Sequence, residues 1–225
     1  MRKPVAARSK LLGVKGDALK TATAVNLETS RRTSATRPAV ERYTGVLYDA
    51  LDYSSLAAND RRRFDQQVVI CSGLWGVVSP RDLIPDYKLK MGATLAGLGR
   101  LSAWWREPLC DAMEPVMSGR VVWNLLPNEH AASLEPLLES TKPRTVITVQ
   151  FLDEVERGGA TTLVRVNHWN KLLKGALVRH VVHHQVIDPP ALEQFVHPLG
   201  YRFEPDLTEV ADRGMSITLV KRLER

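Results

Sequence analysis

The sequence is poor in cysteine: Cys71 and Cys110 are its only two among 225 residues. Neither belongs to a Cys-x-x-Cys pair, so the chain has no disulfide framework. No apolar run approaches the length that spans a bilayer. The basic start lacks the apolar stretch and the small-residue cleavage site of a secretory signal. We therefore expect a cytoplasmic protein that does not associate with membranes.

Aromatic residues are also few, at 6%, and there is no internal repeat, which excludes solenoid architectures. Hydrophobic residues nevertheless make up 44% of the chain, enough to bury a core and to exclude a disordered protein. The length suits one domain, or one domain with an appendage.

Acidic residues are scarce at the beginning of the chain. Residues 1–42 contain ten lysines and arginines against three acidic residues, a net charge of +7, while the remainder carries −1. This asymmetry favours a polyanionic partner, with nucleic acid first and a membrane surface second. The alternative interpretation is a solvated, weakly ordered tail. We expect DNA to be the partner, and the pattern indicates no particular oligomeric state.

The stretch "LLGVKGDAL" has the form of a helix-hairpin-helix. In such a motif Gly13 and Gly16 adopt backbone angles that other residues resist, and Val14 plugs the contact between two helices. The N–H groups that begin the second helix then face an anion such as a nucleic-acid phosphate, with added charge from Lys15 and Lys20. An ordinary helical hairpin with a glycine cap is the alternative.

The remaining pattern mixes helices and strands, which predicts an α+β fold with a mixed β-sheet wrapped by helices. Residues 1–40 form the expected hairpin and basic linker, and residues 41–225 form the α+β body. Gly158–Gly159 is a hairpin signal between two strands. The final strand alternates like an edge strand. The expected helices cover 4–12, 17–28, 99–117, 128–139 and 168–185, and the expected strands cover 120–126, 144–152, 160–167 and 215–224.

The stretch "SGLWGVVSPRDLIPDYKLKMG" (72–92) is too irregular for one regular element. It resembles the signature of the YaaA family of peroxide-stress proteins, whose members carry a similar SGLYG…RP-D…YRLEMG run. The resemblance extends in the same order from about residue 10 to the C-terminus. It includes Tyr43 to Leu51, Trp105, Asn124-Leu125, Glu129, Lys171, Lys174-Gly175, Arg179, Gly200-Tyr201 and Phe203.

This resemblance implies a cytoplasmic DNA-binding protein of the hydrogen peroxide response, credited with limiting damage by free iron. It also implies a sheet wrapped by helices, a helix-hairpin-helix where GVKG lies here, and a basic cleft. The expected cleft cations are Lys88, Lys90, Lys171, Lys174 and Arg179, and the expected polar groups of its pocket are Ser72, Tyr87 and Asn124. A solvated helix face is the alternative for the last three cations.

The chain also departs from the family pattern. Relatives open with an apolar strand and a Pro/Ser motif ending in lysine, which this sequence lacks, so we expect either a start further upstream or a shortened member. Ser79 replaces the arginine of RP-D, and lysines replace arginines elsewhere, although lysine is a poorer bidentate phosphate ligand. An exposed sheet edge is expected where the strand is missing.

Three functions are compatible with these residues. The first is a DNA-binding stress protein that contacts phosphates largely without sequence preference. The second is an enzyme acting on damaged DNA, such as a nuclease or lyase, with Asp82, Glu129 and Lys171 as candidate catalytic residues. The third is an iron-handling protein.

Histidines and cysteines give no clear metal or redox signal. His180 and His184 share a helix face, as a two-histidine metal site requires, but no third ligand is evident. Cys71 lies in the apolar run "VVICSG" and is expected to be a small buried hydrophobe and not a peroxide sensor. We expect no cofactor and no tightly held metal.

Overall fold

The computed structural model describes residues 3–31, 33–140, 143–166, 170–212 and 214–223. These residues form helices together with a mixed sheet, which confirms the predicted α+β class. The chain divides into two compact units. Unit 1 comprises Met1–Tyr43, Asp65–Val116 and Leu126–Leu138, and unit 2 comprises Thr44–Phe64, Met117–Leu125 and Glu139–Arg225.

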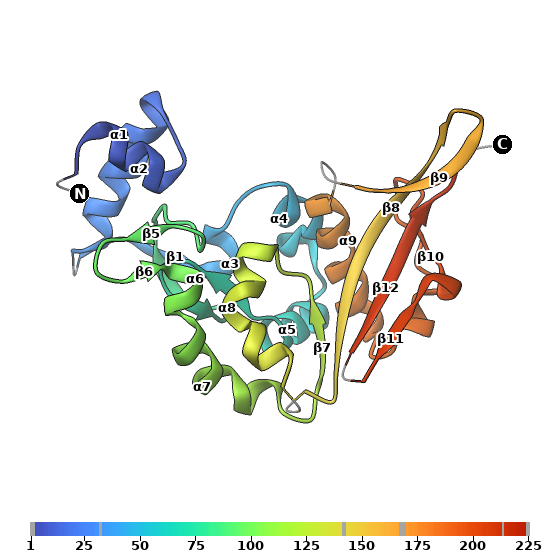
Figure 1. Ribbon diagram of the computed structural model, residues 1–225. Coiled ribbons are helices and arrows are strands. Elements are labelled where there is room, and N and C mark those ends of the chain that lie inside the picture. Colours follow the sequence, from blue (N-terminus) through green and yellow to red (C-terminus); the bar gives the residue numbers. More distant parts are fainter. Residues whose placement is uncertain (1–2, 32, 141–142, 167–169, 213, 224–225) are drawn as a thin grey trace. The chain divides into compact units, whose positions relative to one another are not determined.

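Unit 1 begins with two helices joined by a short turn, α1 (Val5–Leu12) and α2 (Gly16–Thr29) (Figure 1). Both lie where the sequence predicts helices. Leu12, Leu19 and Ala22 are buried and form a small core between them. The short connection between the helices is therefore held by packing as well as by its glycines.

The segment after α2 is not merely a linker. Its strand β1 (Thr36–Pro38) pairs antiparallel with β4 (Leu83–Pro85). Asn26 on α2 acts as a clamp: its Nδ2 donates to Lys88 O at 2.8 Å, and its Oδ1 accepts from Lys88 N at 2.7 Å. Thr29 Oγ1 also donates to Asp86 O at 2.5 Å. These contacts fasten residues 26–38 to residues 83–88 within unit 1.

The remainder of unit 1 consists of short elements. Residues 99–117, expected as one helix, form α6 (Leu101–Trp104) and α7 (Arg106–Met117), because Pro108 has no N–H to donate to the carbonyl four residues earlier. The other elements are α3 (Ala39–Arg42), α8 (Asn128–Leu138), the hairpin of β2 (Ile70–Ser72) and β3 (Gly76–Val78), and the hairpin of β5 (Thr94–Leu95) and β6 (Gly99–Arg100).

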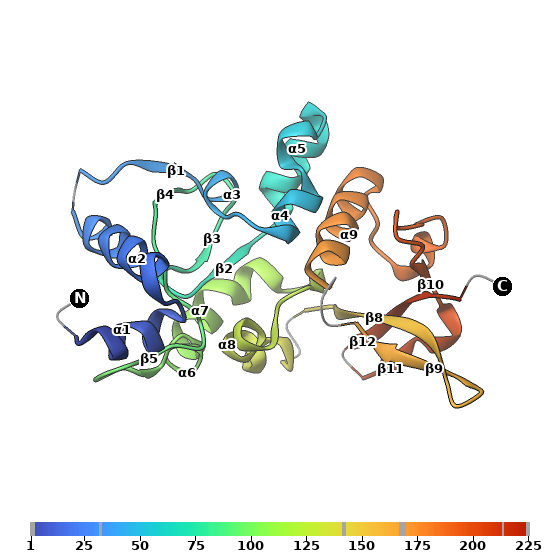
Figure 2. The ribbon, with the colours of Figure 1, turned by 90° about the horizontal axis from the view of Figure 1, so that it is seen from above.

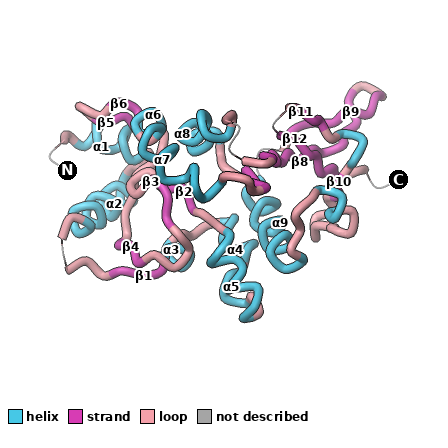
Figure 3. Tube along the Cα trace, turned by 90° about the horizontal axis from the view of Figure 1, so that it is seen from below, coloured by secondary structure: helices cyan, strands magenta, loops and turns pink. Residues whose placement is uncertain are grey.

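Unit 2 contains the mixed sheet (Figure 3). Its strands are β7 (Val121–Asn124), β8 (Thr145–Arg157), β9 (Ala160–Arg165), β10 (Arg202–Phe203), β11 (Glu209–Ala211) and β12 (Gly214–Lys221). Strand β8 lies parallel to β7 on one side and to β12 on the other, and the predicted Gly158–Gly159 hairpin joins β8 to antiparallel β9. Strands β10 and β11 both pair antiparallel with β12.

The prediction that the last strand lies at an edge is wrong. Strand β12 has neighbours on both sides, and Ile217 through Val220 are all buried. Alternating apolar residues predicted one buried face. The second face is buried as well, and its Thr218 is satisfied there by donating to Leu207 O and accepting a hydrogen bond from Gln150 Nε2.

Helix α9 (Asn170–His184) runs along one side of this sheet (Figure 2). Its Leu173 and Leu177 are fully buried in a core that includes Phe151 and Leu219 of the sheet. Residues 186–201 complete the cover with a short 3-10 turn, η2 (Pro189–Leu192). Helix α4 (Val46–Leu51) packs on α9, with α5 (Ala58–Gln67) following it in the chain.

Candidate nucleic-acid interface

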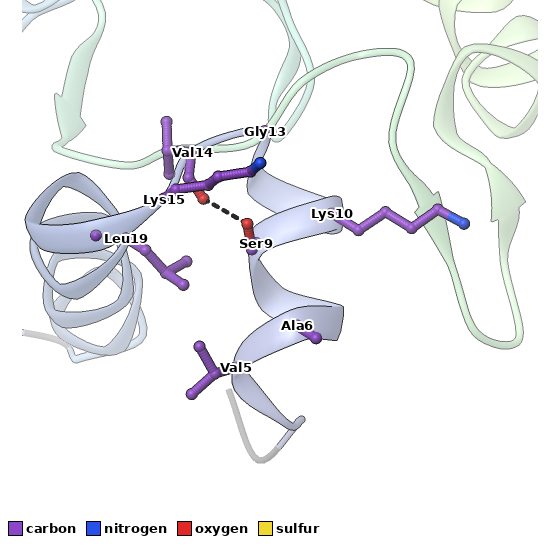
Figure 4. Close-up of a pocket in the computed structure, with 9 residues that line it drawn as sticks. Val5, Ala6, Ser9, Lys10, Gly13, Val14, Lys15 and Leu19 are labelled. Carbon is purple, nitrogen blue, oxygen red and sulfur yellow. Dashed lines mark hydrogen bonds between the residues drawn. The ribbon is translucent and has the colours of Figure 1, made fainter.

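The turn between α1 and α2 adopts the backbone that its glycines predict. Gly13 caps α1 in the left-handed region, with φ 67°, and its N–H donates to Ser9 O at 2.9 Å. Gly16 begins α2 with φ 57°. Ser9 Oγ donates to Val14 O at 2.9 Å, and the partly buried Val14 packs against the small core of the two helices (Figure 4). Hydrogen bonds and apolar packing therefore both hold this turn in place.

The N-terminus of α2 is open. Lys15 is its N-cap residue in an extended conformation, and its side chain makes no capping hydrogen bond. A Cβ added to Gly16 would meet no described atom within 4 Å, so the position beside this first residue of α2 is open. The first N–H groups of any α-helix have no intrahelical partner and carry the positive end of its dipole. This end of α2 can therefore accept an anion.

Charged side chains around this N-terminus act in opposite directions. Lys15 and Lys20 are exposed and favour an anion, whereas Asp17 in the first turn opposes it. Lys20 Nζ lies 2.8 Å from Asp17 Oδ1. Because surface pairs of this kind are weak, either side chain can release the other for a ligand.

A groove of about 930 Å³ lies along the hairpin and reaches the turn. Its walls are mainly apolar and come from both helices, with Val5 and Ala6 on α1 and Leu19 on α2 (Figure 4). Lys10 and Lys15 supply its basic groups.

Lys88 and Lys90 lie beside the hairpin in unit 1. The Asn26 clamp fixes the backbone of Lys88, while the side chain of Lys88 is exposed. The Lys90 ammonium lies against the turn, because a Cβ at Gly13 would overlap Lys90 Nζ. Gly13 caps the C-terminus of α1, where the helix dipole favours a cation. Lys90 thus adds positive charge to the same turn that contains Lys15.

Ser72 and Tyr87, two of the predicted pocket groups, lie together in a chain of hydroxyls. Tyr87 OH is 2.7 Å from Ser72 Oγ and 2.7 Å from Tyr43 OH. Ser72 Oγ also accepts N–H bonds from Leu74 at 3.2 Å and Trp75 at 2.9 Å. Ser72 is only 1% exposed, so its hydroxyl positions this loop from within. Tyr43, which the sequence singled out only through its match to the family pattern, belongs to the same row of hydrogen-bonded hydroxyls.

The two candidate carboxylates of unit 1 have different surroundings. Asp82 is exposed, and its Oδ2 accepts the N–H of Ser79 at 2.8 Å, which closes a local turn. Glu129 lies in the first turn of α8, against Gly92, where a Cβ would come within 2.6 Å of the Glu129 carboxyl carbon. Gly92 therefore leaves the space that the Glu129 carboxylate occupies.

The remaining predicted cations lie on α9 in unit 2. Lys171 is exposed. Lys174 Nζ donates to Leu125 O at 2.9 Å, next to Asn124 at the end of β7, and burial lowers the pKa of Lys174. Arg179 Nη1 donates to Leu51 O at 3.0 Å and Asp52 O at 2.9 Å, at the C-terminal end of α4. Lys174 and Arg179 thus hold α9 against its neighbours.

The histidines of α9 form a cluster at its last turn. The rings of His180 and His184 have centroids 4.3 Å apart, and His183 Nδ1 lies 2.6 Å from Asp60 Oδ2. Burial, followed by the charges of His184 and His183, lowers the pKa of His180 to about 4. The described part of the chain contains no group of three His, Cys, Asp or Glu side chains arranged to hold a metal ion.

Cys71 lies half-buried in β2, and desolvation of its thiol raises the thiol pKa to about 12. A thiol with this pKa has very little thiolate at neutral pH, which agrees with the predicted role as a small hydrophobe. Among the residues that the structure describes, no helix has the length and apolar character needed to cross a membrane.

The fold and these residues define an α+β protein of two units whose first two helices form a basic hairpin. The chain belongs to the family described as peroxide stress protein YaaA, because the model of that family matches residues 2–207. This finding confirms the resemblance.

Relatives of known sequence carry the name UPF0246 protein. One from Streptomyces coelicolor is 37% identical over 190 residues, covering 84% of this chain and 70% of the relative. One from Roseobacter denitrificans is 32% identical over 179 residues, covering 77% of this chain and 67% of the relative. One from Burkholderia cenocepacia is 31% identical over 175 residues, covering 75% of this chain and 64% of the relative.

Proposed function

We propose that this protein binds DNA during peroxide stress, through phosphate contacts made by α1 and α2 acting as a helix-hairpin-helix. The observation that carries the proposal is the start of α2 at Gly16, which no side chain caps and where an added Cβ would meet no described atom within 4 Å. Family membership supports the peroxide-stress role, and the binding of DNA rests on the hairpin.

The hairpin suits a phosphate for two physical reasons. A glycine at the start of α2 lets a bulky anion approach the backbone N–H groups closely, where the helix dipole favours negative charge. Lys15 and Lys90 add full positive charges at the same turn, and Lys10 lies along the groove beside it. Such contacts hold the phosphate backbone without reading base edges, so binding should depend little on sequence.

Two other exposed cations are proposed to contact DNA, each within its own unit: Lys88 in unit 1 and Lys171 in unit 2. Lys20 joins them when a phosphate replaces Asp17 as its partner. Lys174 and Arg179 already donate to backbone carbonyls, so we propose that they contribute through their charge more than through direct hydrogen bonds.

A salt titration tests this proposal. Fluorescence anisotropy of labelled single-stranded, duplex and branched DNA gives the affinity at each salt concentration. Neutralising a few phosphates predicts a slope of roughly −3 to −5 in log K against log salt on duplex DNA. A slope near zero, or a strong preference for one duplex sequence, would contradict the proposal.

Enzymatic and iron-handling roles remain alternatives. Turnover of an oligonucleotide containing damaged bases, lost in Glu129→Gln or Asp82→Asn, would establish the first. Iron that stays bound through anaerobic purification would establish the second.

A further inference from the structure

A second candidate site lies in unit 2 and shares no lining residue with the groove along the hairpin. It is a pocket of about 210 Å³ between two 3-10 turns, η2 and η3 (Pro205–Leu207), and the strands β10 and β12. Apolar side chains make most of its wall: Pro189, Pro190, Phe203, Pro205 and Met215.

The pocket is preformed. Each 3-10 turn begins with a proline, whose ring fixes the backbone angle φ. Phe203 and Met215 pack against the buried core of unit 2. Walls built in this way need no rearrangement to receive a ligand, which lowers the entropy lost on binding.

The apolar surface continues beyond the pocket. Val210 on β11 pairs with Met215 on β12, and partners in an antiparallel register project to the same face. Val210 is 76% exposed, the highest value among the large hydrophobic residues of the chain that the structure describes. A partner can therefore cover Val210 while one of its side chains enters the pocket.

One polar atom among the lining residues lacks a partner. Thr208 Oγ1 is buried and makes no hydrogen bond to any described residue. Buried hydroxyls are normally hydrogen-bonded, so this atom is unsatisfied in the free protein. Tryptophan and tyrosine combine a large apolar ring with one polar hydrogen, and both are enriched as anchors in interface pockets.

The surface around the pocket is acidic. Residues 188–212 contain six acidic residues and one basic residue, a net charge of −5. Glu193 lines the pocket itself, and the exposed Asp206 and Glu209 adjoin its lining residues in the chain. Arg144 lies 3.6 Å from Asp188 and Arg222 lies 3.1 Å from Glu204, so two of the six carboxylates are paired with cations outside this stretch. Charge complementarity therefore favours a basic partner.

We infer that this pocket docks a basic polypeptide segment that inserts one tryptophan or tyrosine side chain between the two 3-10 turns. Its volume lies below the range of pockets for whole small-molecule ligands, about 300–1,000 Å³, and suits a single side-chain anchor. The inference does not depend on DNA binding, because it rests on other residues in the other unit.

The test uses the full chain and a fluorescein-labelled heptapeptide with a central tryptophan, flanked by glycines and then by lysine and arginine. Two control peptides replace the tryptophan with alanine, or the basic residues with glutamate. We expect fluorescence anisotropy to show binding of the first peptide, and affinity roughly tenfold weaker for each control, the change that loss of an anchor produces.

Two variants locate the binding in the pocket. Thr208→Val keeps the side-chain shape and removes the hydroxyl, so it should weaken the tryptophan peptide while raising the melting temperature of the free protein. Glu193→Lys should weaken binding by reversing a charge at the rim. Thr161→Val and Glu156→Lys, at exposed positions elsewhere in unit 2, are the matched controls and should bind normally.

Equal binding by both variants, equal binding of the alanine peptide, or no binding of the tryptophan peptide at millimolar concentration would overturn the inference. Self-association of the wild-type protein that Glu193→Lys abolishes would also overturn it, because the occupant would then be a second copy of the chain. DNA affinity should be the same in Thr208→Val and Thr161→Val as in the wild type, and equal in the two Glu→Lys variants, whatever the outcome with peptides.

Discussion

Replacing Asn26 with leucine tests how α2 is fastened beside the lysines that follow β4. The change removes both hydrogen bonds to the Lys88 backbone, of 2.8 and 2.7 Å, across a sequence separation of 62 residues. Each net hydrogen bond contributes roughly 0.5–1.5 kcal/mol to stability, and water replaces part of it at an exposed site, so the expected loss is about 1–2 kcal/mol. Leucine is a good helix former, so helix propensity does not add to this loss.

Urea denaturation measures this loss as a lower transition midpoint with an unchanged slope. Asn59→Leu, at an exposed asparagine on α5, is the matched control. We also expect weaker DNA binding in Asn26→Leu, because Lys88 and Lys90 are no longer held in register with the hairpin. A midpoint equal to that of Asn59→Leu, together with unchanged DNA affinity, would refute the clamp.

Three further predictions concern packing, protonation and thiol reactivity. Gly175→Ala should destabilise unit 2 by about 1–3 kcal/mol in thermal unfolding, because its Cβ would overlap Leu47 O on α4, and an unchanged melting temperature would contradict this close approach of α4 and α9. The folded state lowers the pKa of His180 from its ordinary 6.5 to about 4, so the unfolded chain binds more protons between these values and stability should fall as pH falls through that window. His180→Leu should flatten this part of the stability curve, and an unchanged curve would show that other groups cause it. Cys71, with its pKa raised to about 12, should react with iodoacetamide at pH 8 far more slowly in the folded than in the unfolded Cys110→Ser protein, and equal rates would contradict the burial of its thiol.

Local patterns predicted local structure well. The spacing of apolar residues and glycines placed α1, α2 and α9 and the hairpin at Gly158–Gly159, because each depends on residues near one another in the chain. The family motif singled out Ser72 and Tyr87 as polar groups, and their hydroxyl oxygens lie 2.7 Å apart in the structure.

Pairing between distant segments could not be predicted in this way. Nothing in "MSITLVK" shows that β8 and β10 will flank it on both sides, since alternation reports the two faces of a strand and not its neighbours. The pairing of β1 with β4 and the Asn26 clamp are likewise set by tertiary packing. The sequence also cannot show whether a basic side chain on a helix binds a phosphate or another part of the protein. Arg179, for example, donates to the backbone carbonyls of Leu51 and Asp52.

The central claim is that phosphate approaches the backbone at the start of α2, and Gly16→Val tests it most directly. The control is Gly119→Val, which also places a side chain at a left-handed position in open space, so strain is matched and only the location differs. In anisotropy titrations with duplex DNA at fixed salt, we expect Gly16→Val to weaken binding more than Lys15→Ala does, because several N–H contacts are lost instead of one charge, and Gly119→Val to bind normally. Normal binding by Gly16→Val, with binding abolished in Lys171→Ala and Lys174→Ala, would show that the hairpin is only a structural turn.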